Sequence, residues 1–205
     1  MRQSGFTEKI KKQIQSAKAG SVFILSDFSD IAETDTVRQA IARLENDGTL
    51  IRIMRGVYYK PEYNELLGEN IAPYPDDIAR AIARNFGWTI VPCGDTALNL
   101  LGLSTQVPSM WVYVSDGEYK EYSYGNTTIK FKRTTNKEIS KLSHKTALTI
   151  QALKALGKEH VTDSVINKLK RVLTKEEKDT MFVEAKTATT WVYEIIKTIC
   201  KDEEK

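Results

Sequence analysis

The chain has 205 residues, 41% of them hydrophobic, and a formal net charge of +3 at pH 7, which suits one large or two small globular domains with a buried core. Its two cysteines exclude a disulfide framework, and no stretch approaches the roughly 20 apolar residues of a membrane span. The charged N-terminal residues differ from a signal peptide, so we expect a cytoplasmic protein without membrane contact.

The first predicted elements precede residue 35. Apolar residues four positions apart predict a helix over residues 6–17, and a short apolar strand is predicted at 22–25. Ser26 and Asp27 are suited to cap a short helix that runs through Ile31. A turn at 33–35 then separates this helix from the next one.

The next helix, predicted at 35–46, is amphipathic. Its apolar stripe consists of Val37, Ala40, Ile41 and Leu44. Gly48 ends the helix, and two β-rich segments at 50–53 and 57–59 predict a basic hairpin. A helix followed by such a hairpin is typical of a winged helix-turn-helix, which we predict for residues 1–62.

Residues 63–74 contain Pro, Gly and Asn without periodicity and are predicted to be a linker to a second domain, residues 75–205. That domain is predicted to begin with a helix that Pro75 opens and Gly87 ends. Its further elements are predicted as strand 88–92, short helix 95–101, strand 109–114, a loop, strand 127–132, and helices near 137–142, 143–156, 162–173, 174–185 and 187–201. The predicted fold is therefore α/β (α+β): a winged helix-turn-helix followed by a mixed α/β domain that ends in a helical bundle.

The candidate DNA-reading residues lie on the helix at 35–46. Those facing away from its apolar stripe are Thr36, Arg38, Gln39 and Arg43. Arginine pairs with guanine and glutamine with adenine in the major groove, so Arg38 and Gln39 are expected to contact bases. Phosphate or minor-groove contacts are expected from Arg52, Arg55, Tyr58 and Lys60. Alternatively, these residues form a solvated face of a winged domain used for protein contact.

Residues 117–175 carry 13 basic and 5 acidic side chains, so the positive charge of the chain is concentrated there. The basic cluster in this stretch consists of Lys130, Lys132, Arg133, Lys137, Lys141 and Lys145. Such a cluster extends a DNA footprint, contacts a partner, or is a solvated charge run.

Catalytic and metal-binding patterns find little support. His144 and His160 lie at predicted helix ends without metal-ligand spacing, and Cys93 is expected to be a buried structural thiol. The sequence has no P-loop, dinucleotide fingerprint or nucleophile elbow. We therefore expect no enzyme activity, no metal and no cofactor.

One segment, CGDTALNL at 93–100, resembles the Gly-rich helix start of nucleotidyltransferases. It has one glycine in place of a pair, and the following strands supply only Asp116 in place of paired metal-binding carboxylates. We expect a packing motif or a fold that has lost the chemistry. A nucleotidyltransferase that uses Gly94, Asp95 and Asp116 is the alternative from the enzyme class.

Several motifs in succession carry a resemblance to a known family. They are VRQAIARLENDGTLIRIMRGVYYKP, CGDTALNLLGLSTQVP, WVYVSDG and the basic strand TIKFKRT. Together they resemble the AbiEi-type antitoxins of bacterial toxin–antitoxin (abortive infection, type IV) systems over nearly the whole chain. The resemblance implies a winged helix that represses its own operon at inverted repeats, and a C-terminal domain that counteracts a nucleotidyltransferase toxin encoded beside it. It implies operator contacts by Arg38, Gln39, Arg43, Arg52 and Arg55.

We therefore expect an antitoxin that binds double-stranded DNA of its own promoter and counteracts a cognate toxin, with direct toxin contact and oligomeric state left open. The main alternative is a winged-helix transcription regulator whose second domain mediates assembly or senses a ligand. A pocket lined by Trp88, Trp111 and Tyr113 is the feature that would favour this alternative.

Overall fold

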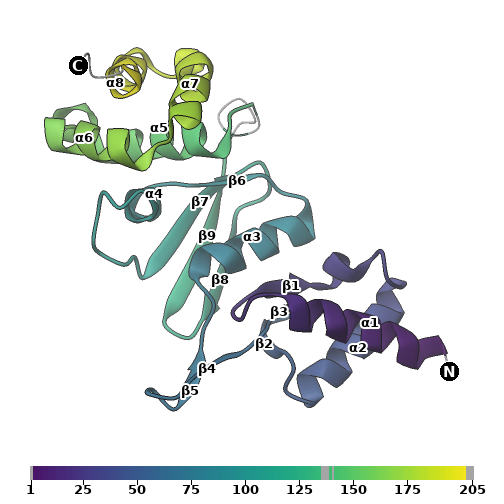
Figure 1. Cartoon of the computed structure of the whole chain (residues 1–205). Coiled ribbons are helices and arrows are strands. Elements are labelled where there is room, and N and C mark those ends of the chain that lie inside the picture. The colour runs from purple at the N-terminus through teal and green to yellow at the C-terminus, as the bar shows by residue number, and fades with distance from the viewer. Residues whose placement is uncertain (1, 135–138, 140, 202–205) are drawn as a thin grey trace. The chain divides into compact units, whose positions relative to one another are not determined.

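The computed structural model describes residues 2–134, 139 and 141–201, and the chain divides into two compact units, Met1–Trp88 and Thr89–Lys205 (Figure 1). Both units combine helices with small sheets, and the regular elements of the described chain from His144 onward are helices, which confirms the predicted mixed α/β class and the helical C-terminal part. Among the described helices, none is long and apolar enough to cross a membrane.

The first unit has two small sheets and three α-helices among its described residues. Its elements are α1 (Arg2–Ser16), β1 (Val22–Ile24), the 3-10 helix η1 (Leu25–Phe28), α2 (Thr34–Asn46), β2 (Ile51–Met54), β3 (Val57–Tyr59), β4 (Glu62–Asn64), β5 (Glu69–Ile71) and α3 (Pro75–Phe86). The short helix that we predicted through Ile31 is the 3-10 helix η1, in which the Asp27 carboxylate accepts a hydrogen bond from the Ile24 N–H at 2.9 Å.

The first sheet has the strand order β1-β3-β2, and both pairings are antiparallel. Strand β3 lies in the centre, with Tyr58 opposite both Phe23 and Arg52. Helix α2 precedes the β2–β3 hairpin and buries its predicted apolar stripe in a core shared with α1 and η1. The core of this unit consists of Ile10, Ile14, Phe23, Phe28, Val37, Ala40, Ile41, Leu44, Leu50 and Tyr58.

The segment predicted as a linker, 63–74, differs from that prediction. Its first part pairs as the antiparallel hairpin β4–β5, and helix α3 then packs against β1 and β3. The Arg84 guanidinium on α3 contacts the Asp27 carboxylate through two nitrogens, at 3.1 and 3.3 Å. Helix α3 therefore belongs to the first unit, and the chain divides after Trp88 rather than at the predicted linker.

The second unit begins with a sheet of four strands. Its elements are β6 (Ile90–Pro92), α4 (Asp95–Leu100), β7 (Met110–Ser115), β8 (Lys120–Tyr124), β9 (Thr127–Arg133), α5 (His144–Leu156), the 3-10 helix η3 (Lys158–His160), α6 (Asp163–Val172), α7 (Lys175–Glu184), the 3-10 helix η4 (Ala185–Thr187) and α8 (Thr190–Cys200). The strand order is β6-β7-β9-β8, in which β7 and β9 are parallel and the other pairs are antiparallel. Strand β8 lies where we predicted a loop.

Helices α5 to α8 of the second unit bury a single apolar cluster. Leu153, Leu169, Met181 and Ile196, one from each helix, are fully buried in it. Half of the predicted helix near 137–142, namely residues 137, 138 and 140, lies outside the described part of the chain.

A carboxylate in this bundle holds the start of α5. Ser143, the N-cap residue of α5, donates from its N–H and from its hydroxyl to Glu184 Oε2 on α7, at 2.9 and 2.8 Å. Burial raises the pKa of Glu184, but hydrogen bonds from Thr146 and Ser143 oppose this effect, and the resulting pKa lies below its ordinary value of 4.5. Glu184 therefore ties α7 to α5 through its ionised form.

This arrangement predicts a pH effect on stability. Because the pKa of Glu184 is lower in the folded chain than in the unfolded chain, its contribution is fully present above about pH 4.5 and is lost as the pH falls through the folded value. Glu184→Gln removes the ionised acceptor and is expected to cost about 1–2 kcal/mol of unfolding free energy at pH 7. Urea unfolding at pH 7 and at about pH 4 measures both effects. Equal losses at the two pH values would contradict this role.

Candidate nucleic-acid interface

Helix α2 presents a polar face opposite its buried stripe. Arg38, Gln39 and Arg43 are exposed, and Thr36 is half-buried. The helical period separates these positions from the stripe, since three- and four-residue steps return to the same face. The predicted reading residues therefore lie on the solvent side of α2, with Thr36 at its margin.

The charge of this face is partly balanced by acidic neighbours. Arg38 Nη1 lies 2.7 Å from Asp35 Oδ1, one turn earlier on α2. At the other end of the helix, Lys11 Nζ on α1 lies 3.3 Å from Asp47 Oδ2. The pKa of Asp47 is lowered, first by hydrogen bonds from Thr49 and also by the Lys11 charge. Arg38 is thus held in place by Asp35 while it remains 63% exposed.

The β2–β3 hairpin adds two exposed arginines. Arg55 lies at the two-residue turn between the strands, beside Gly56, whose φ of 80° favours glycine. Arg52 lies on β2, where its Nε donates to the Met54 carbonyl at 3.4 Å. Both arginines are therefore exposed on the hairpin, where a phosphate backbone is accessible to them.

Two residues that were predicted to contact phosphates are engaged within the first unit. Tyr58 is only 9% exposed and packs in the core of the first unit, so the prediction that it contacts DNA was wrong. Lys60 donates from Nζ to the carbonyls of Gln15 and Ala17, at 2.7 Å each. These carbonyls lie at the C-terminal end of α1, so Lys60 caps that helix, and its phosphate contact stays a prediction.

The role of Lys60 as a cap is testable. Lys60→Met keeps the alkyl stem and removes both hydrogen bonds, and we expect it to lower the free energy of unfolding by about 1–2 kcal/mol. Lys12→Met, on the exposed side of α1, is the control and is expected to change stability by less than about 0.5 kcal/mol. Urea denaturation followed by circular dichroism measures both. A stable Lys60→Met protein with weakened DNA binding would support the phosphate assignment.

The basic cluster of the second unit is only partly assembled. Lys130 and Lys132 alternate with the buried Ile129 and Phe131 on β9, so the two lysines lie on one face of the sheet. Arg133 lies on the opposite face, the same face as Ile129 and Phe131. Lys132, Arg133 and Lys141 are exposed. Lys137 lies outside the described residues.

Two members of this cluster are already paired. Lys130 Nζ lies 3.6 Å from Glu121 Oε2 and 5.3 Å from the centre of the Tyr119 ring. Lys145 Nζ lies 4.0 Å from Glu177 Oε1. Within the described part of this cluster, the exposed positive charge therefore rests on Lys132, Arg133 and Lys141.

The segment that resembles a nucleotidyltransferase loop has structural roles. Gly94 adopts φ 59° and ψ −142°, a conformation that favours glycine, and opens α4. The buried Thr96 hydroxyl accepts the Val112 N–H of β7 at 2.7 Å. The Asp116 carboxylate accepts the Thr89 N–H at 2.8 Å. Among the residues that the structure describes, no group of three or more His, Cys, Asp or Glu side chains is placed to hold a metal.

The other residues considered for chemistry also have ordinary surroundings. Cys93 is buried, and burial raises the pKa of its thiol. His144 is exposed at the first position of α5, and His160 Nδ1 lies 3.0 Å from the Leu156 carbonyl. Trp111 and Tyr113 are 1% and 0% exposed on β7, so they are packed rather than lining an open pocket.

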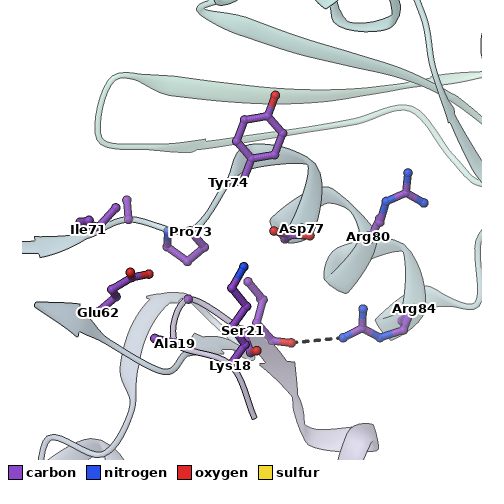
Figure 2. A pocket seen from close by; sticks show the side chains of 13 residues that line it. Lys18, Ala19, Ser21, Glu62, Ile71, Pro73, Tyr74, Asp77, Arg80 and Arg84 are labelled. Atoms are coloured by element: carbon purple, nitrogen blue, oxygen red, sulfur yellow. Dashed lines mark hydrogen bonds between the residues drawn. The ribbon is translucent and has the colours of Figure 1, made fainter. Parts of the chain in front are cut away.

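A cavity that sequence reasoning missed lies in the first unit. It has a volume of about 670 Å³ and is bounded by the α1–β1 turn, the base of the β4–β5 hairpin and helix α3. Figure 2 shows charged side chains of both signs around it: Lys18, Glu62, Asp77, Arg80 and Arg84. Burial and the Asp76 carboxylate raise the pKa of Asp77, against the opposite effect of the cations. The residues that line the cavity are distant from one another in sequence, so no local sequence pattern predicted it.

The comparisons with known proteins give a family but no activity. The comparison with curated proteins finds no match. One protein family matches residues 9–181, which include every described element from α2 to α6. The chain therefore belongs to DUF6088, a family of unknown function.

Proposed function

We propose that the first unit is a winged-helix module that binds double-stranded DNA. The observation that carries the proposal is the order α1, β1, η1, α2, β2, β3 with antiparallel strand order β1-β3-β2, together with the exposed polar face of α2. In a winged helix, the helix before the hairpin enters the major groove and the hairpin flanks it. Here these elements are α2 and β2–β3.

Base reading is assigned to Arg38 and Gln39, with Arg43 one turn further along α2. An arginine fork fits the O6 and N7 acceptors of guanine, and a glutamine amide fits the N7 and N6 groups of adenine. Because Asp35 already orients the Arg38 guanidinium, less side-chain freedom is lost on binding, but the ion pair must be exchanged for the base. Arg52 and Arg55 then contact phosphates and set the register.

The biological role follows from the resemblance to AbiEi-type antitoxins. We propose that the chain represses its own operon through the first unit and counteracts a nucleotidyltransferase toxin, encoded beside it, through the second unit. Lys132, Arg133 and Lys141 are exposed cations of the basic cluster in the second unit that suit an anionic surface or ligand of that system. No catalytic step by this chain is part of the proposal.

A two-part cellular experiment tests this function. A reporter gene is placed behind the DNA upstream of this chain's own gene, and expression is compared with and without the protein. We expect repression by the wild type and none by a variant with Arg38→Ala and Gln39→Ala at equal protein level. An unaffected reporter would contradict autorepression.

The second part expresses the neighbouring nucleotidyltransferase gene with and without this chain. We expect growth to stop with the nucleotidyltransferase alone and to resume with either the wild type or the Arg38→Ala, Gln39→Ala variant, because neutralisation is assigned to the second unit. If growth does not resume, the antitoxin role fails while the repressor role stands on the reporter result.

A further inference from the structure

The β4–β5 hairpin of the first unit exposes large apolar side chains. Leu66 is 97% exposed and Leu67 is 66% exposed at its tip, and Tyr63 is 63% exposed on β4. Ile71 on β5 and Tyr74, just beyond it, are also exposed. Single exposed apolar residues are common, but five within a stretch of twelve residues are the mark of a surface that another protein covers.

The tip of this hairpin is held in one conformation. The Asn64 carboxamide oxygen accepts the N–H groups of Leu66 and Leu67, at 2.9 and 3.1 Å, and the Asn64 carbonyl accepts the Gly68 N–H at 2.9 Å. Gly68 has a φ of 67°, which suits glycine in a tight turn. Leu66 and Leu67 are therefore presented by a preorganised turn, which reduces the entropy lost when they bind.

The hairpin also has free strand edges. Strands β4 and β5 form a sheet of two strands, and all three residues of β5 are exposed. An isolated pair of strands is only marginally stable in water, and an unpaired edge is a template for another strand. A further strand at the β5 edge would form hydrogen bonds with the backbone N–H and C=O groups of that edge. It would also cover the exposed apolar side chains beside it.

The cavity of the first unit lies beside the same segment. Ile71, Pro73 and Tyr74 line one side of it, and the α1–β1 turn with Ala19 lines another (Figure 2). Its volume of about 670 Å³ is within the range of pockets that take a small ligand or a few side chains. Both leucines of the tip are exposed and neither lines this cavity in its own chain.

We propose that two copies of this chain associate through β5, and that the hairpin tip of each copy enters the cavity of the other. In this arrangement the two β5 strands run antiparallel, and the two-fold axis passes through Asn70, so Asn70 of one copy faces Asn70 of the other. A residue a given number of positions after Asn70 then faces the residue the same number of positions before Asn70 in the second copy. Glu69 then faces Ile71 of the second copy, and the turn at 65–68, which carries Leu66 and Leu67, is directed toward residues 72–74 of the second copy. Pro73 and Tyr74 in that segment line the cavity.

The charges fit this register. Residues 61–74 contain Glu62, Glu65 and Glu69 and no basic residue, which disfavours DNA or an anionic membrane as the partner of the hairpin. Within the proposed pairing, Glu69 faces Ile71 of the second copy, so no carboxylate lies opposite another. Glu65 beside the tip approaches the cavity, whose lining carries the cations Lys18, Arg80 and Arg84 as well as the carboxylates of Glu62 and Asp77.

The association state of the full chain tests this proposal, and the test does not depend on the proposed function because no DNA or toxin is present. We expect wild-type protein to sediment as a dimer at about 10 µM. Leu66→Glu with Leu67→Glu is expected to raise the dimer dissociation constant by roughly 30-fold or more, because it removes the apolar area of both leucines and brings carboxylates next to Glu62 and Asp77 of the cavity. Both leucines are exposed, so circular dichroism should show an unchanged fold.

The matched control is Val107→Glu with Val183→Glu, two exposed aliphatic residues of the second unit, which is expected to leave the dimer intact. If the wild-type protein is a monomer at about 100 µM, the proposal is wrong, and a different protein would be the partner of the hairpin. A dimer that persists in the Leu66→Glu, Leu67→Glu variant would overturn it as well.

A cross-link tests the register. Asn70→Cys places one thiol of each copy next to the two-fold axis, and mild oxidation is expected to convert most of the protein to a covalent dimer. Tyr63→Cys, on the opposite strand of the hairpin, is the control and is expected to cross-link at the level of the wild type, which has only its two native cysteines. Efficient cross-linking through Tyr63→Cys and not through Asn70→Cys would overturn the proposed pairing.

Discussion

Replacement of both Arg38 and Gln39 by alanine is expected to lower affinity for the DNA upstream of this chain's own gene by on the order of 10²–10³-fold. Each bidentate base contact discriminates by about 1–3 kcal/mol, and two such contacts are removed. Affinity for a scrambled duplex should fall far less, because Arg43, Arg52 and Arg55 still meet phosphates. Fluorescence anisotropy with the two duplexes at one salt concentration measures the loss of selection.

The matched control for this variant is Asn167→Ala with Arg171→Ala, an exposed amide and an exposed arginine on α6 of the second unit. This control is expected to bind both duplexes as the wild type does. If it loses selection to the same extent, or if the Arg38→Ala, Gln39→Ala variant keeps its selection, α2 is not the reading helix.

Trp111→Ala is expected to cost about 3–5 kcal/mol of unfolding free energy, a large share of the roughly 5–15 kcal/mol that a domain possesses. Trp111 is among the largest fully buried side chains of the described residues, at the start of β7, and its loss leaves a cavity in the sheet core. Urea unfolding followed by circular dichroism measures the loss in the second unit.

Met110→Ala, one position earlier on the same strand, is the control, because Met110 is exposed, and it is expected to cost less than about 1 kcal/mol. This pair separates packing from ligand binding. If Trp111→Ala were as stable as the wild type, Trp111 would not be part of a packed core. It could then line a ligand pocket, as the alternative of a ligand-sensing regulator requires.

The parts of the fold that followed from the sequence are those with strong local signals. The apolar stripe of α2 and the Pro75 and Gly87 boundaries of α3 predicted both helices to within a residue or two of their observed ends. These signals act within one or two turns of chain, so they survive without knowledge of the tertiary structure.

The missed strands have weaker signals. Strands β4 and β5 have three residues each, too short for alternation to be recognised, and their turn depends on one side-chain acceptor, Asn64. Strand β8 alternates Tyr122 and Tyr124 with polar residues in a stretch whose glycines and aspartate indicated a loop. Its pairing with β9 decides its conformation, and pairing is not a local property.

The candidate site was predicted in part for the same reason. The exposure of Arg38, Gln39 and Arg43 agrees with the amphipathic pattern of α2, and Arg52 and Arg55 are exposed on the hairpin. A lysine that binds a phosphate and one that caps a helix look alike in sequence, and the two carbonyls that Lys60 reaches lie 45 and 43 residues earlier. Tyr58 was assigned to the surface because the pattern of a three-residue strand does not show that all its residues are buried.

Whether this chain recognises the DNA sequence upstream of its own gene is tested by a mobility-shift assay. Wild-type protein is titrated onto that DNA and onto a scrambled duplex at several salt concentrations. We expect the affinity for both duplexes to fall as the salt concentration rises. At physiological salt, the affinity for the upstream DNA should still exceed that for the scrambled duplex by on the order of 10³-fold. Equal affinity for the two duplexes at every salt concentration would contradict this expectation, and the polar face of α2 would then be a surface for protein contact.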